Sequence, residues 1–159
     1  MYDPLEFWEK NARNWLKLKH DTDKDWEEIK EFVNPDWKVL ELGCGSGRWA
    51  KYFNDYTGTD IAPSLVISAQ KHHPDKQFFH HDMRFPVPKG FDLIFTYTAW
   101  EHVPPEDIKK VKLPNTRFLF IEPTNKPSVD YCFKHNYEEL FGVKKLKDYG
   151  QLTIYGKLE

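Results

Sequence analysis

A chain of 159 residues is long enough for one domain with a sizeable core, near the lower limit for a doubly wound α/β fold. Its 23 basic and 25 acidic residues are interspersed, and the formal net charge of −2 argues against nucleic acid as the main partner. The two cysteines lack the spacing of a metal site or a disulfide framework. No apolar run reaches membrane-spanning length and the first residues do not resemble a signal peptide, so we expect a cytoplasmic protein without a membrane partner.

Two helices are expected at the start of the chain. Asp3 and Pro4 form a helix start, because an aspartate side chain accepts from free N–H groups and proline suits the first turn. A second helix is expected over Asp23–Phe32. The first helix carries an apolar stripe at helical spacing, comprising Leu5, Trp8, Ala12, Trp15 and Leu16. Packing of its aromatic residues onto a sheet is the favoured interpretation, and closure over a cofactor as a lid is the alternative.

A glycine turn follows the first predicted strand, Trp37–Leu42. Gly43, Gly45 and Gly47 alternate, and a short helical stretch is expected over Arg48–Phe53. Strand, glycine turn and helix are how a doubly wound fold brings a cofactor close to the backbone, where a Cβ atom would block the approach. An arginine stands where the dinucleotide fingerprint G-x-G-x-x-G has its third glycine, so the pattern disfavours a nicotinamide cofactor.

The rest of the chain alternates strands with helices. Strands are expected over Tyr56–Ile61, Gln77–His81, Phe91–Thr96 and Thr116–Glu122. Helices are expected from Pro63, at Pro104–Pro105 and over Val129–Leu140. The chain then forms a predicted hairpin over Val143–Leu158 that turns at Gly150. This alternation predicts a three-layer, doubly wound Rossmann-like α/β fold. The carboxyl ends of its parallel strands meet at one edge, where such folds bind ligands.

Acidic residues at strand ends are the first candidates for ligand contacts. Asp60 ends the second strand, where a carboxylate can accept both hydrogen bonds of a ribose diol; the alternative is an acid favoured by a helix dipole. Asp82 and Met83 follow the third strand, and Glu101 and His102 follow the fourth. The histidine pairs at 72–73 and 80–81 lie on different elements without a recognised metal spacing, so we interpret them as surface or strand-end residues.

Four motifs in order resemble those of the class I S-adenosylmethionine (SAM) dependent methyltransferases, with a core similar to the type 11 and ubiquinone-type O-methyltransferases. V-L-E-L-G-C-G-S-G resembles motif I and T-D-I-A-P-S resembles motif II, and the likeness extends over about 37–158. It implies seven strands in the order 3-2-1-4-5-7-6 with strand 7 antiparallel. It also implies a single methyltransferase domain over 1–159, with residues 1–35 as an N-terminal helical lid and residues 36–159 as the SAM-binding core.

The resemblance also implies an enzyme with SAM as cofactor and S-adenosylhomocysteine as product. Asp60 would bind the ribose, Asp82 the adenine amino group, and the backbone N–H of Met83 the adenine ring. The full set of implied cofactor-binding residues is Glu41, Gly43, Gly45, Gly47, Asp60, Ile61, Asp82, Met83 and Thr96.

W-E-H-V-P-P resembles a methyltransferase segment in which E-x-x-E-H holds a divalent metal. Here Thr98 replaces the first glutamate, and a hard cation needs that charge, so we predict no stable metal; a weak magnesium site completed by substrate stays open. Glu101 and His102 are the candidate catalytic residues. A free histidine has a pKa of about 6.5, which suits His102 to accept a hydroxyl proton, and a packing or capping role is the alternative.

The predicted function is methyl transfer by in-line displacement to the oxygen or nitrogen of a small molecule. No N-P-P-Y type loop follows the fourth strand, and Trp100 is a candidate flat wall for the acceptor. The segments on either side of the fifth strand are shorter than is usual in the family. The alternative is therefore a SAM-binding subunit that is not catalytic by itself, or that depends on a partner chain or a homodimer.

Overall fold

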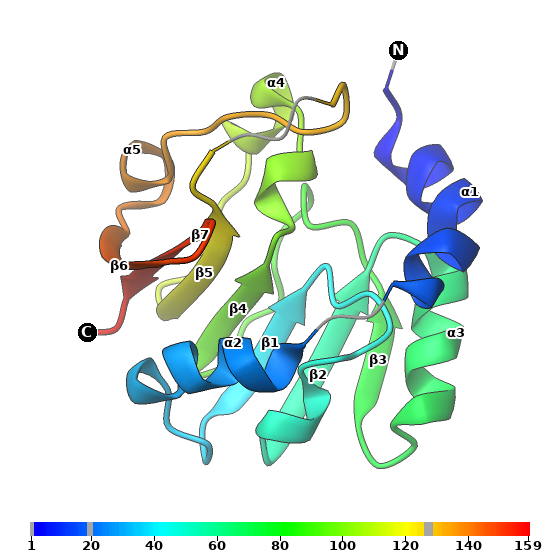
Figure 1. The fold of residues 1–159 in the computed structure, drawn as a ribbon, viewed down its shortest axis with the longest axis horizontal. Helices are drawn as coiled ribbons and strands as arrows, with labels where there is room; N and C mark the ends of the chain where they lie inside the picture. The colour runs from blue at the N-terminus through cyan, green and yellow to red at the C-terminus, as the bar shows by residue number, and fades with distance from the viewer. Residues whose placement is uncertain (1, 19–20, 126–128) are drawn as a thin grey trace.

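The computed structural model describes residues 2–18, 21–125 and 129–159. Its centre is a seven-stranded sheet in the order β3-β2-β1-β4-β5-β7-β6 (Figure 1). The first five strands pair in parallel, whereas β7 is antiparallel to both β5 and β6, so the predicted fold is confirmed. The strands are β1 Lys38–Leu42, β2 Asp55–Asp60, β3 Gln77–His80, β4 Leu93–Tyr97, β5 Arg117–Pro123, β6 Lys144–Tyr149 and β7 Leu152–Lys157.

Five α-helices and three short 3-10 helices surround this sheet in the described ranges. The α-helices are α1 Pro4–Lys17, α2 Thr22–Ile29, α3 Pro63–His72, α4 Pro105–Ile108 and α5 Tyr137–Phe141, and the 3-10 helices are Lys30–Phe32, Ala50–Tyr52 and Trp100–His102. The start of α1 is as predicted, because the Asp3 carboxylate accepts from the backbone N–H of Glu6 at 2.9 Å. Within the described part of the chain, no helix combines the length and apolar character needed to cross a bilayer.

Alternating side chains of the central strands build a core on each face of the sheet. On β1, Val39 packs with α2 and α3 on one face, while Leu40 packs with α4 and α5 on the other. On β4, Leu93 lies on the same face as Val39, and Ile94 lies on the same face as Leu40. All four of these side chains are fully buried. A parallel sheet covered on both faces explains why these strands are apolar throughout.

Two of the predicted helical stretches are shorter in the structure than expected. Only Tyr137–Phe141 is helical within the predicted Val129–Leu140, whose described part before Asn136 is irregular. The Asn136 side chain caps α5 by accepting from the N–H of Glu139, and the N–H of Phe133 donates to the carbonyl of Glu101 instead of to a helical partner. The segment over 48–53 is not an α-helix but turns followed by a 3-10 helix, because only a short connection separates β1 from β2.

Candidate active site

The glycine turn after β1 has a backbone that only glycine adopts without strain. Gly43, Gly45 and Gly47 have φ angles of +73°, +55° and +77°. A Cβ atom on Gly43 would lie 2.9 Å from the Cβ of Ala99, so the turn after β4 packs directly against the glycine turn. A Cβ atom on Gly45 would lie 3.0 Å from the indole nitrogen of Trp15 in α1. The turn therefore packs so closely against α1 and the end of β4 that no side chain fits at Gly43 or Gly45.

A cavity that is partly open to solvent, with about 650 Å³ of space between the atoms that line it, lies at the carboxyl ends of β1, β2 and β4. Seven of the predicted site residues line it: Gly43, Gly45, Asp60, Ile61, Asp82, Met83 and His102. We call it the main cavity. Trp8 and Trp15 of α1 also line it, so the first helix takes part in enclosing the space.

Four predicted site residues do not line the main cavity. Glu41 lines a second, smaller cavity, and Gly47 faces the ring of Phe78, where a Cβ atom would be 2.8 Å from the ring. Thr96 is fully buried in β4, and Glu101 lies behind His102 and is 6% exposed. The structure therefore places Gly47 and Thr96 in packing positions, and the roles predicted for them as cofactor-binding residues stay predictions.

Asp60 fixes the end of β2 against the glycine turn. One oxygen of its buried carboxylate accepts from the N–H of Gly45 at 2.8 Å, and the other accepts from the N–H of Ala62 at 2.9 Å. Burial raises the pKa of Asp60, while these backbone donors lower it. Each carboxylate oxygen has a second lone pair, so the group retains the capacity to accept from a diol in the main cavity.

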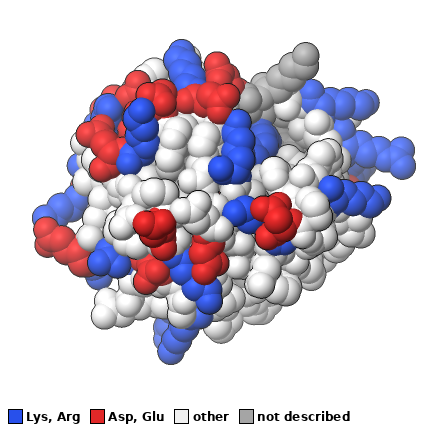
Figure 2. All heavy atoms as spheres, turned by 90° about the horizontal axis from the view of Figure 1, so that it is seen from below, with Lys and Arg blue, Asp and Glu red and all other residues white. Residues whose placement is uncertain are grey.

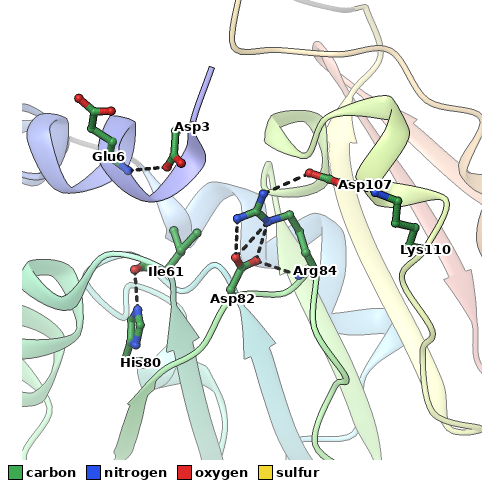
Figure 3. Close-up of polar contacts among 8 residues, drawn as sticks. All are labelled: Asp3, Glu6, Ile61, His80, Asp82, Arg84, Asp107 and Lys110. Atoms are coloured by element: carbon green, nitrogen blue, oxygen red, sulfur yellow. Dashed lines mark hydrogen bonds and ion pairs between the residues drawn. The ribbon is translucent and has the colours of Figure 1, made fainter. Parts of the chain in front are cut away.

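Asp82 is part of an ion-pair network at the rim of this cavity (Figure 3). Its carboxylate accepts from Arg84 Nη2 at 2.6 Å and from Arg84 Nε at 3.0 Å. Arg84 Nη1 also donates to Asp107 in α4 at 3.1 Å, which ties the loop after β3 to the connection between β4 and β5. Asp82 thus follows β3 and lines the main cavity, and its contact with the adenine stays a prediction. Arg84 is a partner that the sequence motif does not predict.

His102 faces the main cavity with one ring nitrogen already engaged. Nδ1 lies 3.0 Å from the carbonyl oxygen of Tyr131. A carbonyl oxygen only accepts hydrogen bonds, so Nδ1 must carry the proton. In this neutral tautomer, Nε2 is the acceptor. The ring packs edge-on against Trp8 with centroids 4.7 Å apart. Burial lowers the pKa of His102 to about 4, so the expectation of a pKa near neutrality is wrong.

Glu122, at the end of β5, holds the turn that carries Glu101 and His102. Its fully buried carboxylate accepts from the N–H groups of Ala99 at 3.2 Å, Trp100 at 3.0 Å and Glu101 at 3.3 Å. Burial and the neighbouring Glu101 raise the pKa of Glu122 to about 8. Glu122 is absent from the predicted site, although an acid at a strand end is the same signal that selected Asp60.

Cys132 completes a cluster with Glu101 and His102, whose ligand atoms all lie within 4.8 Å of one another. Glu101 Oε1 is 3.7 Å from His102 Nε2, and Cys132 Sγ is 3.6 Å from His102 Nδ1. Cys132 lies in the segment wrongly predicted to be helical, which is why its proximity to His102 was not foreseen. Burial raises the pKa of Glu101, which favours its protonated form over a charged metal ligand.

Trp100 is not the flat wall of the acceptor site. Its side chain is fully buried and packs against Phe120 and Phe141 in the core. The aromatic surface at the main cavity comes instead from Trp8, with Tyr131 behind it at a ring distance of 6.5 Å. Residues of α1 and of the segment after β5 meet only in the folded chain, so local sequence did not reveal this surface.

Thr98 has a strained backbone at the edge of the main cavity. Its φ angle of +48° makes it the only non-glycine residue with a positive φ in the described ranges, and β-branched residues rarely adopt this conformation. Its N–H donates to the carbonyl of Ile121 at 2.7 Å, continuing the pairing of β4 with β5. Together with the bonds from Glu122 to the next three N–H groups, this contact holds the turn in place.

We expect Thr98→Gly to raise the free energy of unfolding by about 1 kcal/mol, because glycine adopts positive φ without the steric cost. Thermal melting should show an increase of about 2–4 °C for a domain of this size. Thr98→Ala keeps a Cβ atom in the same conformation and serves as the control, with little gain expected. Equal melting temperatures for wild type and Thr98→Gly would mean that the turn is not strained.

The comparisons with known proteins agree with this geometry. Residues 39–113 match the family described as "Methyltransferase domain". Magnesium protoporphyrin IX methyltransferase (ChlM) from Synechocystis PCC 6803 with bound SAM is similar in structure, with a TM-score of 0.71 at 14% identity over 98% of this chain and 97% of that one. The DhpI–SAH complex has a TM-score of 0.69 at 14% identity, covering 96% and 93%. A TehB-like SAM-dependent methyltransferase from Corynebacterium glutamicum has a TM-score of 0.64 at 16% identity, covering 95% and 96%.

The fold is that of the class I SAM-dependent methyltransferases, as the sequence motifs predict. The match to the methyltransferase-domain family covers residues 39–113, a little under half of the chain. The structural neighbours establish the fold over nearly the whole chain, and the family match lies on the half that carries the glycine turn and Asp60.

Proposed function

We propose that this protein transfers the methyl group of SAM to an oxygen or nitrogen of a small molecule. The observation that carries the proposal is the convergence of Gly43, Gly45, Asp60 and His102 on one cavity at the carboxyl edge of the sheet. Three of these residues belong to the side predicted for the cofactor, and His102 belongs to the side predicted for the acceptor. A single cavity that both molecules can enter is what a direct transfer between them needs.

The residues of the main cavity suit the adenosine part of SAM. The positive-φ glycines expose backbone beside the cavity, Asp60 retains free lone pairs for the ribose, and Asp82 lies at the rim for the adenine. His81 Nε2 is buried at this cavity without a hydrogen-bond partner in the described part of the chain, so a ligand would satisfy it. SAM supplies a methyl group on a good leaving group, so the protein has mainly to align the acceptor and exclude water.

On the acceptor side, His102 is the group that meets a substrate. The bond from Nδ1–H to Tyr131 fixes the tautomer, and Nε2 is then the atom that accepts a proton from a hydroxyl. Glu101 Oε1 lies 3.7 Å from Nε2, where its carboxyl can orient the imidazole. We propose that this pair acts without a metal, because both groups are largely desolvated and favour their neutral forms.

A small acceptor is favoured over a nucleic acid by the balance of 23 basic and 25 acidic residues, with a formal net charge of −2. On the face seen from below in Figure 2, basic and acidic side chains are interspersed. The alternative is a SAM-binding subunit that depends on a second chain, and the brevity of α4 between β4 and β5 supports it. An acceptor screen with the isolated protein separates the two, because a partner-dependent subunit would bind SAM and methylate nothing.

Asp60→Ala tests the cofactor side directly. We expect it to weaken SAM binding by about 1–3 kcal/mol, the scale for losing hydrogen bonds to a charged group. Isothermal titration calorimetry measures this, and thermal melting shows whether the loss of the Gly45 contact also unfolds the turn. Asp55→Ala, on the exposed first residue of the same strand, is the matched control and should bind SAM like wild type. Unchanged affinity in Asp60→Ala would remove this residue from the cofactor site.

A further inference from the structure

Cys132 is a buried thiol that the proposed reaction does not use. It lies between β5 and α5, is 3% exposed, and its Sγ is 3.6 Å from Nδ1 of His102. Ligand atoms of Cys132, His102 and Glu101 lie within 4.8 Å of one another. Among the described residues, no other three His, Cys, Asp or Glu side chains gather as closely. The cluster therefore has the composition and the compactness of a metal site.

The donor set of this cluster favours zinc over magnesium. Zinc binds imidazole nitrogen, thiolate sulfur and carboxylate oxygen in a tetrahedral arrangement. Magnesium prefers an octahedron of oxygen ligands, which a sulfur and a nitrogen do not provide. A neutral Glu101 counts against a hard cation, which depends on carboxylate charge, whereas imidazole and thiolate are the ligands that select zinc. This set also differs from the E-x-x-E-H pattern, because Cys132 comes from another part of the chain.

The hydrogen bond from His102 to Tyr131 orients the ring for metal binding. Nδ1 donates to the Tyr131 carbonyl at 3.0 Å, so Nε2 is the nitrogen that can bind a metal. Histidines that bind metals almost always donate their other N–H to such an acceptor, which fixes the ring. Glu101 Oε1 lies 3.7 Å from Nε2, close to the separation of about 3.3–3.6 Å between ligand atoms of tetrahedral zinc. Cys132 has to rotate from the Nδ1 side toward Nε2 to complete the site.

The second carboxyl oxygen of Glu101 points to a ligand independently. Oε2 is buried and has no hydrogen-bond partner in the described part of the chain, and the residue is 6% exposed. An unsatisfied buried polar atom is costly, and a bound cation would remove that cost. Because His102 lines the main cavity, which is partly open to solvent, an ion can reach the cluster through this cavity.

We propose that Glu101, His102 and Cys132 form a zinc site at the main cavity, and that zinc bound there inhibits methyl transfer. Binding releases the thiol proton of Cys132 and the proton of a neutral Glu101 carboxyl to solvent. His102 Nε2 then donates its lone pair to zinc, so it cannot accept the proton of a hydroxyl acceptor. The inhibition rests on the proposed function, because it concerns the same nitrogen, whereas zinc binding does not.

Cobalt tests the site itself, because Co²⁺ occupies zinc sites and a thiolate ligand gives it a strong charge-transfer absorption in the near ultraviolet. Titration of reduced wild type should produce this band at one saturable site, and added Zn²⁺ should abolish it. Cys132→Ser and Cys132→Ala should both lack the band. Their zinc affinity, measured against a chromophoric chelator, should fall by more than the about 10- to 100-fold typical of a lost outer-shell partner.

Controls separate loss of the ligand from loss of the fold. Cys44→Ser removes the other buried cysteine, which is not part of the cluster, and should keep the cobalt band. Thermal melting shows whether each variant is folded. No band in wild type, or an equal band in folded Cys132→Ser, would overturn the proposed site.

The effect on activity is measured with an acceptor found by screening. Saturating Zn²⁺ should lower wild-type turnover by about 10²-fold or more, as for loss of the His102 base, and EDTA should restore it. Cys132→Ser should keep its basal turnover and resist the same Zn²⁺ concentration. Zinc binding that leaves wild-type turnover unchanged would overturn the inhibition. Failure of wild type to bind SAM would instead contradict the proposed function and would leave the cobalt result unaffected.

Discussion

His102→Ala is expected to lower turnover on a hydroxyl acceptor by about 10²–10⁴ while leaving SAM affinity nearly unchanged. The reason is that His102 lines the main cavity and that the bond from Nδ1 to the carbonyl of Tyr131 leaves Nε2 as its acceptor atom. Because burial lowers its pKa to about 4, His102 is neutral at neutral pH. The acid limb of the wild-type pH–rate profile should therefore lie near pH 4–5, well below neutrality.

Radiolabelled SAM and an acceptor found by screening provide the turnover measurement, and calorimetry provides the affinity. Glu101→Gln is the companion variant, because it keeps the shape of the side chain and removes the carboxyl group beside His102 Nε2. Wild type should keep its activity in EDTA, whereas loss restored by magnesium would show that the cluster of Glu101, His102 and Cys132 binds a metal. Wild-type turnover in both variants would mean that alignment alone drives the reaction.

Glu122→Gln is expected to change how the stability of the protein depends on pH. The pKa of Glu122 is raised from 4.5 to about 8, so the folded protein holds a proton that the unfolded chain releases above pH 4.5. Wild type therefore loses stability as the pH rises through this window, whereas the glutamine variant does not. From pH 5 to pH 9 the stability of the variant relative to wild type should rise by about 3–5 kcal/mol, at 1.36 kcal/mol per pKa unit.

Urea unfolding at pH 5 and pH 9 measures this difference. Glu106→Gln, on an exposed side chain of α4, is the control and should behave like wild type at both values. Glu122→Ala should be less stable than wild type at both pH values, because the N–H groups of Ala99, Trp100 and Glu101 lose their acceptor. A pH-independent difference between Glu122→Gln and wild type would show that Glu122 is ionised in the folded state.

The order of strands was predictable because its signals are local. Apolar runs bounded by glycine and proline mark β1, β4 and β5, and the three glycines mark the tight connection out of β1. The segment over 129–136 was not predictable in this way. Its apolar residues have helical spacing. However, the N–H of Phe133 donates to the carbonyl of Glu101, which is distant in the sequence, instead of to a helical partner. Helix α5 therefore starts only after its cap, Asn136.

In the candidate site, too, the residues that belong to a local motif were predictable, and those that depend on contacts between distant segments were not. Asp60 and the glycines were predictable because one short motif carries each of them. The low pKa of His102 was not, because it depends on burial beneath Trp8 and beside Tyr131, which come from distant parts of the chain. Arg84 and Glu122 likewise act through contacts between separate loops.

Calorimetry of the purified protein with SAM, S-adenosylhomocysteine and NAD tests the assignment of the cofactor site most directly. We predict saturable binding of SAM and S-adenosylhomocysteine at one site and no binding of NAD. We also predict that Gly45→Val abolishes binding, since a Cβ atom there meets Trp15 and the residue must keep a φ of +55°. Binding of NAD in place of SAM, or no binding of either SAM or its product, would contradict this assignment.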